Sequence, residues 1–228
     1  MWLSLFTPVH PDGSRLYDTR MSNTTMVTCR GWWDLADSDL FYPEDLPQDW
    51  RLSYFANSFR AALLPAALWT DADPQTAAQW YDDVPPGFRF AAEQSLTPSQ
   101  ATQARRQPLV PAELEQRLGA KLDAWIEPID ESASTTLSTI TGSDANRRLR
   151  YQRRPTDQRG ETDPERSCPS CYGLIAPAEL HRDLRRARDW LRKMAEQQGQ
   201  APSLIIMARP SSTDLSAWQE LLDLLGLG

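Results

Sequence analysis

Apolar residues along the chain fall into short continuous runs and longer segments with helical spacing. The short runs predict buried strands at 26–32, 60–69 and 203–208, and residues 85–93 predict a turn followed by a strand. Apolar residues that recur every three or four positions predict helices, which lie at 47–59, 71–84, 111–126, 176–199 and 211–226. Strands that alternate with helices indicate parallel β/α units, and a series of such units is typical of a TIM-type barrel or an open doubly wound sheet.

Turn and capping residues sharpen several of these boundaries. Pro65 predicts that the strand at 60–69 ends or bulges near its middle. Asp73 and Pro74 are typical of the N-cap and first position of the helix at 71–84. Gly199 predicts the end of the helix at 176–199.

Two segments fit neither pattern, although a single α/β domain is expected over residues 1–228. Residues 1–25 place a Pro-Asp-Gly turn between short apolar stretches, which predicts an N-terminal hairpin or extension. Residues 128–176 are rich in Ser, Thr, Asp, Arg and Pro with little periodicity, which predicts a long, mobile polar insertion.

The composition narrows the class of protein. Of the 228 residues, 40% are hydrophobic, which suffices for a core, and the net charge of −7 argues against general binding to nucleic acid or a membrane surface. No apolar run approaches the roughly 20 residues that span a bilayer, and the first residues do not resemble a signal peptide. Three cysteines fit a reducing compartment better than a disulfide scaffold. A cytoplasmic protein is therefore expected.

An arginine-rich stretch is the candidate for nucleic-acid contact. Its residues are Arg147, Arg148, Arg150, Tyr151, Arg153 and Arg154. Arginine beside an aromatic residue suits phosphate contact and base stacking. The alternative, a solvated loop facing the acidic rest of the chain, is favoured because the overall charge opposes nucleic acid.

Metal and cofactor chemistry find little support. Cys168 and Cys171 have the spacing of half a zinc site, but Cys29 and His181 are the only evident further ligands. With two histidines in the chain, histidine-based catalysis is poorly supported. Neither a metal nor a cofactor is predicted.

Several stretches carry a family resemblance when taken in order. In the first, the matching residues are Gly31, Trp32, Phe41, Tyr42, Pro43, Trp50, Leu52, Tyr54, Phe55, Ala56 and Phe59. Residues 76–93 and 201–211 add two more stretches. Together they resemble the YecE-like family, domain-of-unknown-function family 72, over residues 26–95 and 180–225. The resemblance implies a TIM barrel.

Departures from the family pattern remove the polar groups that the family directs at the barrel mouth. Where the family has Ser, Glu, Asn, Lys, Gln and Pro, this sequence has Arg30, Leu63, Pro65, Glu93, Met207 and Arg209. Residues 61–68 hold no polar side chain. Because a barrel enzyme needs polar groups at its strand ends, the resemblance implies a catalytically degenerate member that acts as a binding or interaction protein.

The resemblance places the aromatic residues after the first strand at the barrel mouth, where they either cover it or contact a ligand. The candidate ligand-binding residues are Arg30, Trp32, Trp33, Tyr42, Glu93 and Arg209. The alternative is an enzyme with a relocated site, built from the acids Asp34, Asp37, Glu93 and Asp130.

The last helix predicts a partner. The chain is short for its content, and the resemblance implies a partial or truncated barrel with open sheet edges. The apolar face of the helix consists of Leu215, Trp218, Leu222 and Leu225. We expect a second copy or a protein partner to cover this face and to complete the sheet.

Overall fold

The computed structural model describes residues 24–95, 109–129, 148–153 and 171–228. The strands are β1 (Met26–Cys29), β2 (Ala61–Leu64), β3 (Arg89–Glu93), β4 (Leu122–Ile126), β5 (Arg148–Arg153), β6 (Tyr172–Ala176) and β7 (Leu204–Met207). The α-helices are α1 (Ser38–Phe41), α2 (Arg51–Ser58), α3 (Ala66–Asp71), α4 (Pro74–Asp82), α5 (Pro111–Leu118), α7 (Leu184–Gln198) and α8 (Ser212–Leu224). Short 3-10 helices are η1 (Gln48–Trp50), η3 (Gly119–Lys121) and η6 (Ala178–Leu180). None of these helices is long and apolar enough to span a membrane.

The strands pair in the order β1-β7-β6-β5-β4-β3-β2. The pairs are parallel except at β5, which runs antiparallel to β4 and β6. β1 and β2, at the two ends of this order, are joined by a parallel bridge between Arg30 and Leu63. The Thr28 hydroxyl also donates to the Ala61 carbonyl over 2.8 Å. The chain is therefore α/β with mostly parallel strands, as the sequence predicts.

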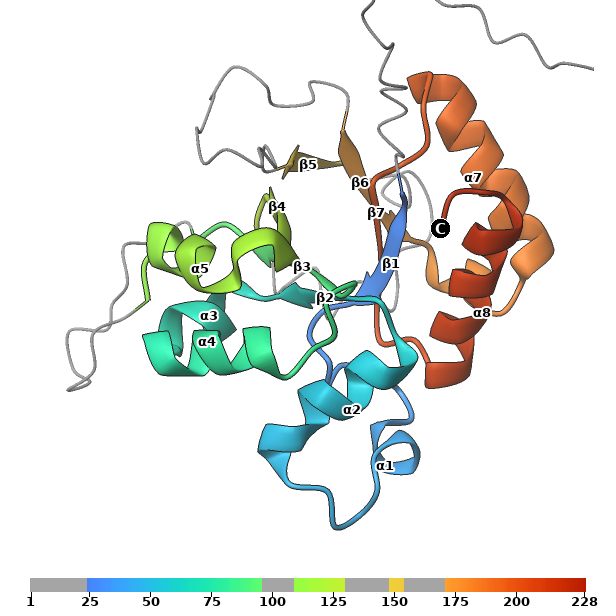
Figure 1. Cartoon of the computed structure of the whole chain (residues 1–228). Coiled ribbons are helices and arrows are strands. Elements are labelled where there is room, and N and C mark those ends of the chain that lie inside the picture. The colour runs from blue at the N-terminus through green and yellow to red at the C-terminus, as the bar shows by residue number, and fades with distance from the viewer. Residues whose placement is uncertain (1–23, 96–108, 130–147, 154–170) are drawn as a thin grey trace, which may run out of the picture.

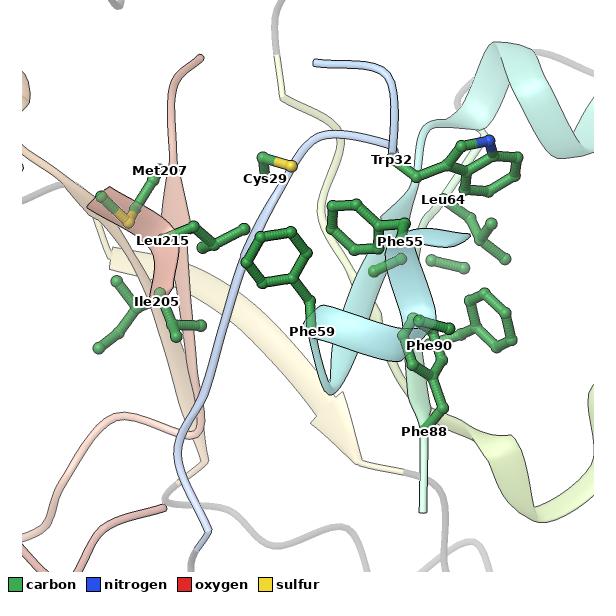
Figure 2. Close-up of a cluster of buried hydrophobic side chains, with 14 of the residues drawn as sticks. Cys29, Trp32, Phe55, Phe59, Leu64, Phe88, Phe90, Ile205, Met207 and Leu215 are labelled. Carbon is green, nitrogen blue, oxygen red and sulfur yellow. The ribbon is translucent and has the colours of Figure 1, made fainter. Parts of the chain in front are cut away.

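Helices flank the strands on several sides (Figure 1). α7 and α8 lie beside β1 and β7, while α3, α4 and α5 lie beside β2, β3 and β4. The largest hydrophobic cluster fills the space between helices and strands. Figure 2 shows part of it, with Cys29 of β1, Phe55 of α2, Ile205 of β7 and Leu215 of α8. Removal of this apolar surface from water is the main favourable contribution to folding.

A second cluster joins side chains from neighbouring strands. β2 contributes Leu63, β4 contributes Ala124, β5 contributes Leu149 and β7 contributes Ile206. Side chains alternate between the two faces of a strand, so Leu63 enters this cluster whereas Ala62 and Leu64 enter the first. β2 and β7 are thus buried on both faces, which explains why their sequences are continuous apolar runs.

Capping residues fix the helix ends as the sequence predicts. The Asp73 carboxylate accepts from the Thr76 backbone N–H over 2.8 Å, and Pro74 begins α4. Gly199 ends α7 in the left-handed region, with φ of 72°. A capping box between Ser211 and Asp214 starts α8.

The strand predicted at 60–69 ends near Pro65, as the proline predicts: β2 ends at Leu64. The rest of the apolar run was not predicted to be helical, but Ala66–Asp71 form α3. Pro65 lacks the N–H that would continue the strand pairing, so the chain leaves the sheet there.

The predicted helix at 111–126 is wrong in its second half. α5 ends at Leu118 because Gly119 adopts φ of 49°. Leu122 and Trp125, which continue the helical spacing in the sequence, instead belong to β4.

The expected insertion at 128–176 supplies β5 and β6, which lie inside the strand order. Leu149 and Leu174 are buried there, so the description of this segment as a loop is wrong for these parts. Its remaining residues, 130–147 and 154–170, lie outside the described part of the chain, as do residues 1–23 of the expected N-terminal hairpin.

The apolar face of α8 is covered by the chain itself. Leu215, Trp218 and Leu222 are at most 1% exposed and belong to the main core, and the half-buried Leu225 packs against it. Trp218 Nε1 donates to the His181 carbonyl over 3.1 Å. The expectation that this face forms an interface is therefore wrong.

Candidate functional site

A buried ion pair joins the carboxyl ends of β1 and β3. Arg30 Nε donates to Glu93 Oε1 over 2.6 Å, and Arg30 Nη2 donates to Glu93 Oε2 over 2.9 Å. The backbone N–H of Ala66, at the start of α3, donates to Glu93 Oε2 over 3.2 Å. The Glu93 side chain is 1% exposed and that of Arg30 is 18% exposed. Each charge is therefore paired at a site from which water is largely excluded.

The Arg30–Glu93 ion pair lies across the apolar carboxyl end of β2. β2 lies between β1 and β3, because Leu63 bridges to Arg30 and Leu64 pairs with Ala92. The Arg30 side chain must reach across the end of β2 to meet Glu93. Arg30 and Glu93 each depart from the family pattern, and the structure shows that the two departures are partners.

Trp33 is held against the turn that follows β1. Gly31 has φ of 84°, in the region that favours glycine, and a Cβ added there would lie 2.7 Å from the Trp33 ring. The ring of Trp33 therefore packs directly over Gly31, with 40% of the residue exposed. Its ring meets that of Trp32 edge to face, with centroids 5.0 Å apart. The Gly31 turn thus fixes a partly exposed aromatic surface at the end of β1.

Trp32 and Tyr42 are part of the core. Both are buried, and the Tyr42 hydroxyl donates to the Trp32 carbonyl. Burial raises the pKa of Tyr42 above its ordinary value. The Trp32 ring also meets the Trp80 ring, with centroids 6.0 Å apart. These two residues therefore support the site from behind and do not line the pocket.

A pocket of about 730 Å³ lies between the end of β1 and helices α3 and α4. The polar and aromatic residues that line it include Arg30, Trp33, Asp34, Asp71, Thr76 and Trp80. Pro65, Ala67 and Leu68 add an apolar wall. Pockets that bind small molecules have volumes of roughly 300–1,000 Å³ and combine apolar walls with a few polar groups. The pocket therefore has the size and composition of a ligand site.

Asp34 brings a partly buried carboxylate to this pocket. Burial raises the pKa of its carboxyl, while the Arg209 guanidinium, the Arg209 backbone N–H and the Arg30 guanidinium act in the opposite direction. Arg209 Nε lies 3.8 Å from Asp34 Oδ1, and the Arg209 side chain is largely exposed. Arg209 also has φ of 43°, which is unusual for a residue with a side chain. Arg209 thus lies beside Asp34 at the rim and is not part of the lining.

The other acids expected in a relocated catalytic site either make structural contacts or lie outside the described residues. Asp37 accepts from the backbone N–H and the hydroxyl of Ser212, over 2.8 and 2.7 Å, and so anchors the start of α8. Glu93 is held by Arg30. Asp130 lies outside the described residues. Of the three acids that the structure describes, Asp34 is the one that lines the pocket.

The described cysteines and histidine do not form a metal centre. Cys29 is buried, its Sγ donates to the Gly31 carbonyl, and burial raises the pKa of its thiol. Cys171 is buried, and Cys168 lies outside the described residues. Burial lowers the pKa of His181. Within the described residues no group of three or more His, Cys, Asp or Glu side chains is placed to hold a metal ion.

The arginine-rich stretch forms a strand where a loop was favoured. Arg148, Tyr151 and Arg153 belong to β5, and Arg150 is exposed on it. Leu149, next to Arg150, is fully buried. Arg147 and Arg154 lie outside the described residues.

The sequence did not single out Asp71, Thr76 or Trp80 as site residues. All three come from α3 and α4, and α3 was not predicted as a helix. Thr76 and Trp80 lie inside the stretch at 76–93 that carries the family resemblance, which is the signal that could have pointed to them.

Residues 26–137 match the family model described as a protein of unknown function, DUF72. The chain belongs to the DUF72 family in this region. The match covers β1 to β4 and every pocket residue named above. No curated protein and no solved structure shows a significant match to the chain.

Proposed function

We propose that this DUF72 protein is a non-catalytic binding protein whose ligand occupies the pocket beside Trp33. The observation that carries the proposal is a ligand-sized pocket whose polar neighbours are mostly committed to structural contacts. Arg30 and Glu93 bind each other, and Asp73 caps α4. Groups held in this way can position a ligand, but general acid–base catalysis needs groups that are able to exchange protons with it.

We also propose that the strands close into a seven-stranded barrel that carries this pocket at its mouth. In a flat sheet of this order, β1 and β2 would lie about 29 Å apart at the usual strand spacing. Yet Leu63 of β2 and Ile206 of β7 belong to one cluster, and Met26 of β1 packs against it. Gly31 N–H also donates to the Leu63 carbonyl over 2.9 Å. The sites of β/α barrels lie at the carboxyl ends of the strands, which is where the pocket lies.

A pocket-filling variant tests the binding proposal. Ala67 lines the pocket and is exposed, so Ala67→Trp should fill the pocket without disturbing the core. Ala112→Trp, at an exposed position in the first turn of α5, is the matched control. A chemically diverse set of small metabolites is screened by thermal shift against the full chain and both variants.

The expected result is at least one compound that stabilises the wild type and Ala112→Trp but not Ala67→Trp. The bound compound should be recovered unchanged after prolonged incubation. Conversion of the compound would favour the alternative, an enzyme that uses Asp34. The absence of any compound sensitive to Ala67→Trp would overturn the binding role.

A further inference from the structure

We propose that the pocket takes a small organic cation, with an ammonium or guanidinium group on an apolar body. This inference rests on the proposed binding function and adds the chemical class of the ligand. It follows from the balance of charge, the aromatic surface and the apolar wall of the pocket.

The charge of the lining is negative. Asp34, Asp71 and Asp73 line the pocket together with one basic residue, Arg30. The Arg30 guanidinium is already matched by the Glu93 carboxylate in a bidentate pair. Arg209 lies at the rim, 3.8 Å from Asp34, so the pocket and its immediate contacts set four carboxylates (Asp34, Asp71, Asp73 and Glu93) against two guanidinium groups (Arg30 and Arg209). This excess of negative charge disfavours an anionic ligand and attracts a cation.

The three carboxylates differ in their availability. Asp73 accepts from the backbone N–H and the hydroxyl of Thr76, over 2.8 and 3.0 Å, and is committed to the cap of α4. Asp34 and Asp71 come from different elements, the turn after β1 and the end of α3, and both line the pocket. A ligand cation would share the Asp34 carboxylate with the exposed Arg209 guanidinium at the rim and would meet Asp71 at the end of α3.

The aromatic surface suits the same ligand. Trp33 is 40% exposed and is held in place by the Gly31 turn and by the Trp32 ring. Trp80 forms another part of the lining. The faces of tryptophan rings attract cations more strongly than those of other aromatic residues. A ring held rigidly before binding also loses little conformational entropy when the ligand arrives.

The apolar wall selects against a bare metal ion. Pro65, Ala67, Leu68 and Ala72 line the pocket beside the carboxylates. Inorganic cations prefer several oxygen ligands around them, whereas this lining offers apolar surface for a hydrocarbon body. The occupant that fits both features is an organic cation.

An isosteric pair of probes tests the charge directly. Choline carries a quaternary ammonium group, and 3,3-dimethyl-1-butanol has nearly the same shape without the charge. Binding of each to the full chain is followed by tryptophan fluorescence and by calorimetry at neutral pH. Choline is expected to bind about tenfold more tightly than the alcohol, because the alcohol loses the cation–π and carboxylate contacts.

Variants locate the effect within the pocket. Asp34→Asn and Asp71→Asn are each expected to weaken choline binding roughly three- to tenfold and to leave binding of the alcohol unchanged. Asp45→Asn, at an exposed position outside the pocket, is the control and should change neither. Trp33→Leu should weaken choline binding more than Trp33→Phe, which keeps an aromatic face. Circular dichroism confirms that each variant is folded.

The outcomes separate the ligand class from the binding function. Equal affinity for choline and the alcohol, with both blocked by Ala67→Trp, would overturn the cation class and leave the pocket as a binding site. Absence of choline binding at tens of millimolar would overturn the cation class as well. Choline binding that survives Ala67→Trp would overturn the assignment of the cation to this pocket.

Discussion

Two bidentate Arg–carboxylate pairs lie at opposite ends of the strands and differ mainly in burial. At the carboxyl ends, Arg30 and Glu93 are 18% and 1% exposed. At the amino ends, Arg60 just before β2 donates to Asp223 of α8 over 2.7 and 2.8 Å, with exposures of 65% and 41%. The same geometry thus occurs in two very different dielectric environments.

The cavities beside these two ion pairs differ in volume. The pocket beside Arg30 measures about 730 Å³, whereas the cavity beside Arg60 measures about 100 Å³. At the amino end, backbone contacts such as Thr25 N–H to the Leu227 carbonyl hold the chain together. One end of the strands is thus closed by close contacts, whereas the other end carries the pocket proposed to bind a ligand.

Breaking each ion pair in turn gives the largest expected effect. Arg30→Met leaves the buried Glu93 carboxylate without its partner, which should cost about 3–5 kcal/mol in the free energy of unfolding. Arg60→Met removes an exposed pair and should cost about 0–1 kcal/mol. Denaturant unfolding measures both.

A second substitution checks that the loss comes from the unpaired charge. Adding Glu93→Gln to Arg30→Met should recover part of the stability, because the amide oxygen still accepts from the Ala66 N–H. Equal losses for the two arginine variants would mean that burial does not distinguish the two ends.

Replacing glycines at two helix or strand ends gives the next largest effect. Gly31 and Gly199 both have positive φ, but a Cβ at Gly31 meets the Trp33 ring at 2.7 Å, whereas one at Gly199 meets nothing within 4 Å. Gly199→Ala should therefore cost about 1–2 kcal/mol from backbone conformation alone. Gly31→Ala should cost about 3 kcal/mol, since crowding adds to the same backbone cost.

Removing the ring isolates the crowding. In the Gly31→Ala background, Trp33→Ala should restore part of the lost stability, and the non-additivity of this double-mutant cycle measures the contact. If Gly31→Ala and Gly199→Ala cost the same, Trp33 is not packed against the turn as described.

The parts of the fold that the sequence predicted correctly are those with strong local signals. Asp73 and Pro74 predicted the start of α4 and Gly199 predicted the end of α7, because capping depends on neighbouring residues alone. Leu122 and Trp125 continued a helical spacing past Gly119, and the glycine was the overlooked stop signal. β5 is rich in arginine and was not predicted as a strand, since its place in the sheet is set by pairing with β4 and β6.

The site was less predictable than the fold, because its partners are distant in sequence. Arg30 and Glu93 were each recognised as departures from the family pattern, but their pairing depends on β2 lying between β1 and β3. Asp71 lines the pocket because α3 follows β2 directly. A strand was predicted over residues 60–69, so the helix that carries Asp71 was missed. Both cases depend on how strands and helices are arranged in three dimensions, which a single sequence does not reveal.

The smallest expected effect is a difference in pH dependence between the two ends of the strands. Burial raises the pKa of Asp34, whereas hydrogen bonds from Arg60 lower the pKa of Asp223. A raised carboxyl pKa means that Asp34 favours the folded state below its ordinary value of 3.8, and that this contribution is lost as pH rises through the raised value. Arg209 and Arg30 are the charged groups that act on its carboxyl.

Asp223 has the opposite sign. Its contribution is present above the ordinary value of 3.8 and is lost as pH falls through the lowered value. Melting temperatures between pH 3 and pH 7 should therefore rise for Asp34→Asn relative to wild type as pH increases, and fall for Asp223→Asn. Each difference corresponds to no more than about 1 kcal/mol, because both carboxylates retain contact with solvent. Parallel curves for the two variants would show that Asp34 is as well solvated as Asp223, and the pocket would lose its partly buried carboxylate.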